Sequence, residues 1–85
     1  MKITFLGGGN MANALIGGMF KQGFAAADIT VIDPGSAARD KLERTYAVNC
    51  LETGEMLDNV GDLLVLAVKP QQMKEAVAPL VGKLG

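Results

Sequence analysis

The chain has 85 residues, of which 49% are hydrophobic and 20% are charged, and its formal net charge at pH 7 is −1. This length allows one small domain with one hydrophobic core, and the balanced charge gives no electrostatic reason to expect binding to nucleic acid or to an anionic membrane. One cysteine and no histidine exclude an internal disulfide and give no cluster with metal-ligand spacing.

The first apolar run, residues 3–6, is too short for the core of a signal peptide or for a membrane span. The single cysteine, Cys50, suits a reducing compartment. These two features predict a soluble cytoplasmic protein.

A strand predicted over residues 2–6 leads into a glycine-rich turn and then into a helix predicted over residues 10–22. A strand, a G-x-G-x-x-A turn and a helix in this order favour dinucleotide binding. Gly7 permits the tight turn, Gly9 lets a pyrophosphate approach the backbone, and Ala12 lets the helix pack closely on the strand. The helix N-terminus presents N–H groups and partial positive charge to the phosphates. The predicted contacts are Leu6, Gly7, Gly8, Gly9, Asn10, Met11 and Ala12.

The alternative for this segment is a glycine-rich turn without a ligand. Asn10 either caps the helix, contacts the pyrophosphate, or does both. Along the helix, Met11, Leu15 and Met19 recur every four residues and predict its apolar face. Gly17 and Gly18 predict close approach to the sheet, and Gly23 predicts the end of the helix.

The second predicted strand, residues 29–32, ends at Asp33-Pro34-Gly35. A carboxylate at this position accepts hydrogen bonds from the adenosine ribose and repels a 2′-phosphate, which favours NAD over NADP. The alternative is that Asp33 forms the turn or caps the next helix. Ser36 is expected to cap a helix over residues 37–45, with Ala38 and Leu42 facing inward. Ser36 and Arg39 could instead bind a 2′-phosphate, although an exposed helix position is the simpler explanation for Arg39.

The remaining predicted elements are a brief strand near Val48, a short helix over residues 54–59, a strand over 63–68 and a helix over 71–84. The run LLVLAV predicts a parallel strand that is buried on both faces. Pro79 is expected to break the last helix. Its apolar face is predicted to comprise Met73, Val77, Leu80 and Leu84.

The alternating elements predict an α/β domain of the Rossmann type, a parallel sheet with helices on both faces. Right-handed crossovers give the strand order 3-2-1-4, with the cofactor crevice between strands one and four. Strand four then lies at an edge, so the sheet is incomplete without following strands. We therefore expect residues 1–85 to be the front part of a longer protein.

Lys69 and Pro70 follow the fourth strand on the rim of this crevice. The lysine could meet a cofactor phosphate or a substrate carboxylate, and the alternative is a solvated side chain. Cys50 is interpreted as a small buried residue without a nearby activating group. Met19, Met56 and Met73 are candidates for the core by their spacing.

Two segments, FLGGGNMANALIGG and LLVLAVKPQ, resemble the N-terminal domain of the pyrroline-5-carboxylate reductases. That family pairs a G-x-G-x-M-A turn with an A-V-K-P segment, here Ala67, Val68, Lys69 and Pro70. The resemblance implies hydride transfer from NADP(H) or NAD(H) to the C=N bond of 1-pyrroline-5-carboxylate, which gives proline. It also implies a following helical dimerisation domain that supplies much of the substrate pocket, and a parent protein that is a homo-oligomer.

The chain departs from that family pattern at two places. Asp33-Pro34 stands where small polar residues or Asn-Arg are common, and the segment CLETGE lacks the asparagine often found after strand three. The alternatives are another two-domain NAD(P) oxidoreductase, of the 3-hydroxyacid or prephenate dehydrogenase type, and a non-catalytic dinucleotide-binding module. The segment AVKPQ argues against the first.

Overall fold

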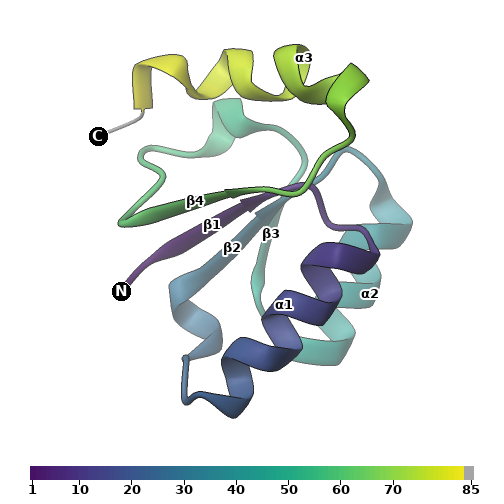
Figure 1. Ribbon diagram of the computed structural model, residues 1–85, viewed down its shortest axis with the longest axis vertical. Coiled ribbons are helices and arrows are strands. Elements are labelled where there is room, and N and C mark those ends of the chain that lie inside the picture. Colours follow the sequence, from purple (N-terminus) through teal and green to yellow (C-terminus); the bar gives the residue numbers. More distant parts are fainter. Residues whose placement is uncertain (84–85) are drawn as a thin grey trace.

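The computed structural model describes residues 1–83, which form one four-stranded parallel sheet (Figure 1). The strands are β1 (Ile3–Leu6), β2 (Ile29–Ile32), β3 (Asn49–Leu51) and β4 (Leu63–Leu66). Their order is β3-β2-β1-β4, and every neighbouring pair is parallel. The predicted order is therefore confirmed, and the carboxyl ends of all four strands meet at one edge of the sheet.

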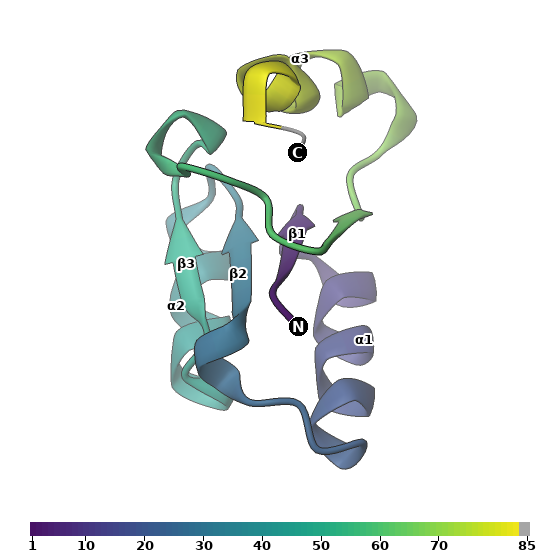
Figure 2. The same ribbon diagram turned by 90° about the vertical axis from the view of Figure 1, so that its left-hand side faces the viewer.

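Helices cover both faces of the sheet, as predicted. Figure 1 shows α1 (Asn10–Lys21) and α2 (Ser36–Tyr46) on one face, and Figure 2 shows α3 (Met73–Val77) above the carboxyl ends of the strands. Short 3₁₀ segments are η1 (Ala26–Asp28), η2 (Gly54–Met56), η3 (Pro70–Gln72) and η4 (Ala78–Lys83). None of the helices in the described part of the chain has the length and apolar character needed to span a bilayer.

Two hydrophobic clusters lie on opposite faces of the sheet, because successive side chains of a strand point in opposite directions. Ile3 and Phe5 of β1 join the cluster beneath α1 and α2, whereas Leu6 joins the cluster beneath η4. The first cluster comprises Ile3, Phe5, Ala12, Ile16, Ile29, Val31, Leu42 and Val48. The second comprises Leu6, Ile32, Val60 and Leu80.

The apolar face predicted for α1 is wrong, because the buried residues lie one position later in the sequence. Ala12 and Ile16 are fully buried, whereas Met11 and Leu15 are 54% and 44% exposed. Met19 is half-buried against the first cluster. The small side chain of Ala12 allows the helix to lie close to β1, and this contact sets the rotation of the helix.

The two glycines within α1 do not approach the sheet, which corrects a second expectation. A Cβ atom at Gly17 would lie 2.9 Å from the hydroxyl oxygen of Tyr46 on α2, and one at Gly18 would meet open space. The Tyr46 hydroxyl also lies 2.9 Å from the side-chain oxygen of Asn13. Gly17 therefore serves the packing of the two helices, while Gly23, at φ +93°, ends α1 as predicted.

Strand β4 is not buried on both faces. It is an edge strand, so Leu63 and Leu66 are 46% and 45% exposed, and it ends at Leu66. Continuous apolar sequence therefore overstates burial for a strand at the sheet edge.

Two of the methionines predicted for the core are not buried there. Met56 is exposed and lies outside the core, and Met73 is only half-buried.

The last helix is shorter than predicted, because α3 ends at Val77 and gives way to η4 just before Pro79. The predicted break at Pro79 is thus confirmed, since proline has no N–H group and clashes with the preceding turn. Leu84, the last residue of the predicted face, lies outside the described residues. The helix expected over residues 54–59 is only the short segment η2.

Segment η4 is attached to η2 by packing and by hydrogen bonds. Leu80 is fully buried, and a Cβ atom at Gly54 would lie 2.7 Å from its Cδ2 atom. The Lys83 ammonium donates to the carbonyl oxygens of Gly54 and Glu55, each at 3.0 Å. These contacts hold the C-terminal segment across the second face of the sheet.

Truncation of Leu80 tests this attachment. Leu80→Ala should lower the free energy of unfolding by about 2–4 kcal/mol, because it removes a fully buried side chain and leaves a cavity. Val81→Ala, at the exposed neighbouring residue, should change it by less than about 0.5 kcal/mol. Urea denaturation followed by circular dichroism measures both, and equal losses for the two variants would contradict the packing described here.

Candidate functional site

The turn after β1 requires glycine at its first position. Gly7 has φ +103°, and its N–H donates to the carbonyl oxygen of Ile32 at 2.8 Å. A Cβ atom at Gly7 would lie 2.6 Å from the carbonyl oxygen of Ala67. The tight turn is therefore confirmed, and the structure adds a close approach between this turn and the segment that follows β4.

Open space lies above the start of α1. Gly9 is the N-cap residue, and a Cβ atom built on it would have no neighbour within 4 Å among residues 1–83. The Asn13 N–H donates to the Gly9 carbonyl oxygen at 3.0 Å and closes the first turn of the helix. The N–H groups before it have no acceptor in the helix, so this end of α1 suits an anion.

Asn10 is the first residue of α1 and does not cap the helix. The cap is Gly9, which has no side chain to accept a hydrogen bond. The same correction applies at α2, where Gly35 is the cap and Ser36 is the exposed first helical residue. Both helices therefore begin without side-chain capping, and their first N–H groups stay open to other acceptors.

Gly8 and Ala12 connect the turn to the core. Ala12 is fully buried, in agreement with its predicted packing role. A Cβ atom at Gly8 would lie 3.0 Å from Leu42 Cδ1 and 3.1 Å from Val31 Cγ1. Gly8, to which the sequence motif assigns no separate role, thus packs against α2 and β2.

The Asp33 carboxylate joins two turns. Its Oδ2 atom accepts a hydrogen bond from the Gly8 N–H at 2.8 Å, and its Oδ1 atom accepts one from the Gly35 N–H at 2.7 Å. The turn-forming alternative for Asp33 is therefore observed. Each carboxylate oxygen accepts more than one hydrogen bond, so contact with a ribose stays a prediction.

Arg39 is not the exposed helix residue that the sequence suggested. Its side chain is 20% exposed, and its Nη1 atom donates to the main-chain carbonyl oxygen of Asp33 at 2.8 Å. Its Nη2 atom lies 3.9 Å from Oε2 of Glu52, which follows β3. Arg39 thus connects the β2–α2 turn to the segment that follows β3.

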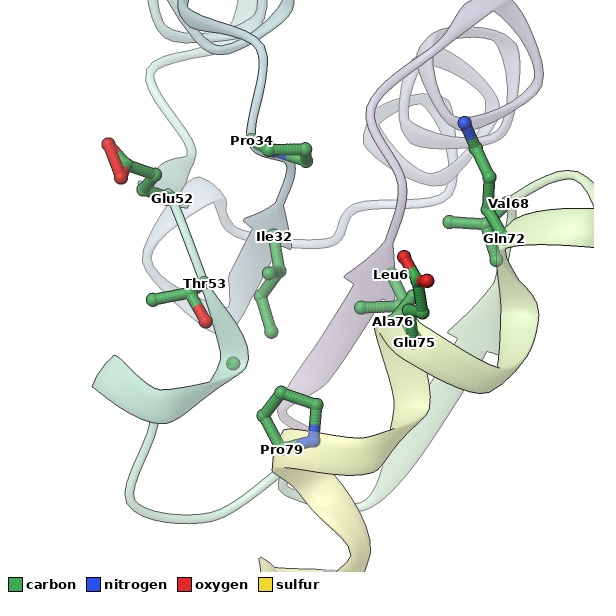
Figure 3. A pocket seen from close by; sticks show the side chains of 11 residues that line it. Leu6, Ile32, Pro34, Glu52, Thr53, Val68, Gln72, Glu75, Ala76 and Pro79 are labelled. Carbon is green, nitrogen blue, oxygen red and sulfur yellow. The ribbon is translucent and has the colours of Figure 1, made fainter.

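A pocket of about 310 Å³ lies at the carboxyl ends of the strands (Figure 3). Its floor includes Leu6 of β1 and Ile32 of β2, and Leu6 directly precedes the glycine turn. The other lining residues are Pro34, Glu52, Thr53, Gly54, Val68, Gln72, Glu75, Ala76 and Pro79. The pocket therefore lies beside the turn and is lined by residues at or just after the ends of all four strands, by α3 and by neighbouring 3₁₀ segments.

The segment after β4 lies against the glycine turn. The Ala67 N–H donates to the Leu6 carbonyl oxygen at 2.8 Å, and Val68 lines the pocket. Lys69 and Pro70 are exposed, and Pro70 begins η3. The fold thus brings Ala67 and Val68 to the predicted crevice, while Lys69 stays on its rim.

Cys50 is a half-buried packing residue, as interpreted from the sequence. Burial raises the pKa of its thiol above the ordinary value, and the nearby charge of Glu43 raises this pKa further. The Sγ atom lies 3.6 Å from the Arg39 carbonyl oxygen. A thiol with a raised pKa carries little thiolate at neutral pH, so Cys50 does not have the properties of a nucleophile.

Residues 2–84 match the model of the family described as NADP oxidoreductase coenzyme F420-dependent. The chain belongs to this family. It is 43% identical over 81 residues to the pyrroline-5-carboxylate reductase of Pseudomonas aeruginosa, which covers 92% of this chain and 30% of that protein. The identity to the reductase of Haemophilus influenzae is 42% over 83 residues, 92% of this chain and 28% of that protein.

A plant relative also matches nearly the whole of this chain but less than a third of its own length. The pyrroline-5-carboxylate reductase of Arabidopsis thaliana is 32% identical over 85 residues, 98% of this chain and 30% of that protein. The resemblance to this group of reductases is therefore confirmed. The chain spans about 30% of the length of the curated relatives it matches.

The sequence pointed to the glycine turn, to the β2–α2 turn with Asp33, Ser36 and Arg39, and to the segment after β4. The sequence did not identify Glu52, Thr53 and Gly54, which follow β3, or the pocket residues of α3 as site residues. These residues have no motif of their own and meet only because α3 lies across the sheet edge. The one local signal was Pro70, which starts the short helical segment that leads to α3.

The space above Gly9 can be tested by filling it. Gly9 has φ −79°, which any residue adopts, so Gly9→Val should fold and should lose at least about tenfold in NADH affinity, because its side chain occupies the phosphate path. Gly18→Val is the matched control, since this glycine also faces open space within α1. Titration of NADH fluorescence measures both variants, and unchanged binding by a folded Gly9→Val protein would show that the site is wrongly placed.

Proposed function

We propose that this chain forms the cofactor-binding part of a pyrroline-5-carboxylate reductase. In that reaction NADH or NADPH supplies a hydride to the carbon of the C=N bond of 1-pyrroline-5-carboxylate, and a proton adds to the nitrogen to give proline. The observation that carries the proposal is the glycine turn, with open space above Gly9 and an uncapped start of α1. Similarity to reductases of this name supports the substrate.

The contacts proposed for the cofactor follow from the geometry. The N–H groups of Asn10 and Met11 and the partial positive charge of the helix terminus would bind the pyrophosphate. Asp33, beside the turn, would accept hydrogen bonds from the adenosine ribose. The pocket residues Ile32, Pro34 and Ala76 are apolar and suit a flat base.

The rim of the crevice is proposed to serve the reacting end. Ala67 and Val68 lie against the glycine turn, and the exposed Lys69 and Pro70 follow them. A lysine there would attract a cofactor phosphate or the carboxylate of the substrate.

We further propose that residues 1–85 are the N-terminal Rossmann portion of a cytoplasmic protein, which is completed by more strands and by a helical dimerisation domain. The open edge at β4 supports additional strands. The parent protein would be a homo-oligomer in which helices of the later domain and of a second subunit form the substrate pocket. Its partner is a small molecule, with no nucleic acid and no membrane.

Residues 1–85 alone should not reduce 1-pyrroline-5-carboxylate. Rapid hydride transfer needs donor and acceptor atoms held about 3–3.5 Å apart in an aligned pose, and this chain presents only one side of the cleft. The assay follows NAD(P)H oxidation with substrate for this chain and for a full-length reductase from which the segment is taken. Turnover at a rate near that of the full protein would place the substrate site within these residues and would contradict the proposed arrangement.

A further inference from the structure

We propose that the adenosine end of this site is selective for a free ribose 2′-hydroxyl, so that NADH binds more tightly than NADPH. This inference rests on the proposed function and makes it more specific. It also departs from the NADP named in the family description. Its basis is the arrangement of Asp33, Arg39 and Glu52 around the β2–α2 turn.

Asp33 holds a negative charge in a fixed position. Hydrogen bonds of 2.8 Å and 2.7 Å from the N–H groups of Gly8 and Gly35 orient its carboxylate between the glycine turn and α2. The Gly35 N–H belongs to the N-cap of α2. Asp33 therefore already occupies one of the donors that a 2′-phosphate would need at this helix terminus.

Arg39 is the cation best placed to bind a 2′-phosphate, but it is already held by the turn and paired with a carboxylate. Nη1 donates to the main-chain carbonyl oxygen of Asp33 at 2.8 Å, and Nη2 lies 3.9 Å from the Glu52 carboxylate. A phosphate would have to compete with Glu52 for the charge of this guanidinium group. The hydrogen bond to the Asp33 carbonyl oxygen also fixes the guanidinium group within the turn, so Arg39 is not free to reorient toward a phosphate without losing that bond.

Glu52 adds a second carboxylate to the same region. Its side chain is 66% exposed, and it lines the pocket with Pro34 and Thr53. Asp33, Arg39 and Glu52 together carry a formal charge of −1. A phosphate monoester carries about −1.5 to −2 at pH 7, so it is repelled here, whereas a hydroxyl group can donate to Asp33.

Ser36 does not reverse this balance. It is an exposed first residue of α2 and offers one neutral hydroxyl. A single neutral donor is weaker than the charge-assisted bonds that usually hold a phosphate. The residues around the turn therefore favour the 2′-hydroxyl.

The test compares the dissociation constants of NADH and NADPH for this chain, measured by calorimetry at low salt. The expected result is that NADH binds about tenfold more tightly, and that the ratio narrows as salt screens the repulsion. Glu52→Gln should raise the affinity for NADPH relative to that for NADH by about threefold. The matched control is Glu55→Gln, which removes an exposed charge outside the pocket lining and should not change the ratio.

Two further variants identify the groups responsible. Adding Arg39→Gln to Glu52→Gln should reverse the gain for NADPH, because it removes the positive charge beside Asp33. Asp33→Ser should shift the ratio toward NADPH by removing the fixed carboxylate. An unchanged ratio of the NADH and NADPH dissociation constants would show that Asp33 faces away from the ribose. It would overturn the proposed contribution of Asp33 to the selectivity.

The outcomes separate the two proposals. If neither dinucleotide binds, the proposed function fails and the selectivity fails with it. If both bind and NADPH binds as tightly as NADH or more tightly, the cofactor site stands and the selectivity is overturned. If Glu52→Gln and Glu55→Gln change the ratio equally, overall charge explains the effect and the local role of Glu52 is overturned.

Discussion

The close approach of the main chain at Gly7 to the main chain at Ala67 determines the shape of the candidate site. The parallel pairing of β1 with β4 continues past Leu6, where the Ala67 N–H donates to the Leu6 carbonyl oxygen. The turn after β1 therefore has no room for a side chain at its first position, and Gly7 adopts φ +103°. The chain then enters α1 within three residues, so the start of the helix is held at the carboxyl edge of the sheet.

The glycine turn and the strand order could be predicted because their signals are local. The spacing of Gly7, Gly9 and Ala12 specifies a strand, a turn and a helix, and right-handed crossovers then determine the order of the strands. The buried face of α1 could not be read from hydrophobicity, since Met11 and Leu15 are larger than Ala12 yet more exposed. Close contact between helix and strand selects a small residue, and such contact is a tertiary property.

The pocket shows the same limit of sequence reasoning. Thr53 and Ala76 lie far apart in sequence, have no motif, and line one pocket because η4 is attached to η2 through Leu80 and Lys83. The position of Asp33 was predictable from the end of the second strand, but its hydrogen bonds to Gly8 and Gly35 were not. Those bonds depend on how closely two turns approach after the sheet has formed.

The charges around the turns favour one orientation of the proposed cofactor in the site. The start of α1 would attract the doubly charged pyrophosphate of the proposed cofactor. The carboxylates of Asp33, at the glycine turn, and of Glu52, in the pocket lining, would disfavour further negative charge. A dinucleotide has its anionic groups at the centre and an uncharged adenosine at one end, and it matches this pattern in one orientation. The carboxylate that links the turns would thus also help to place the adenosine in the pocket and the nicotinamide toward Lys69.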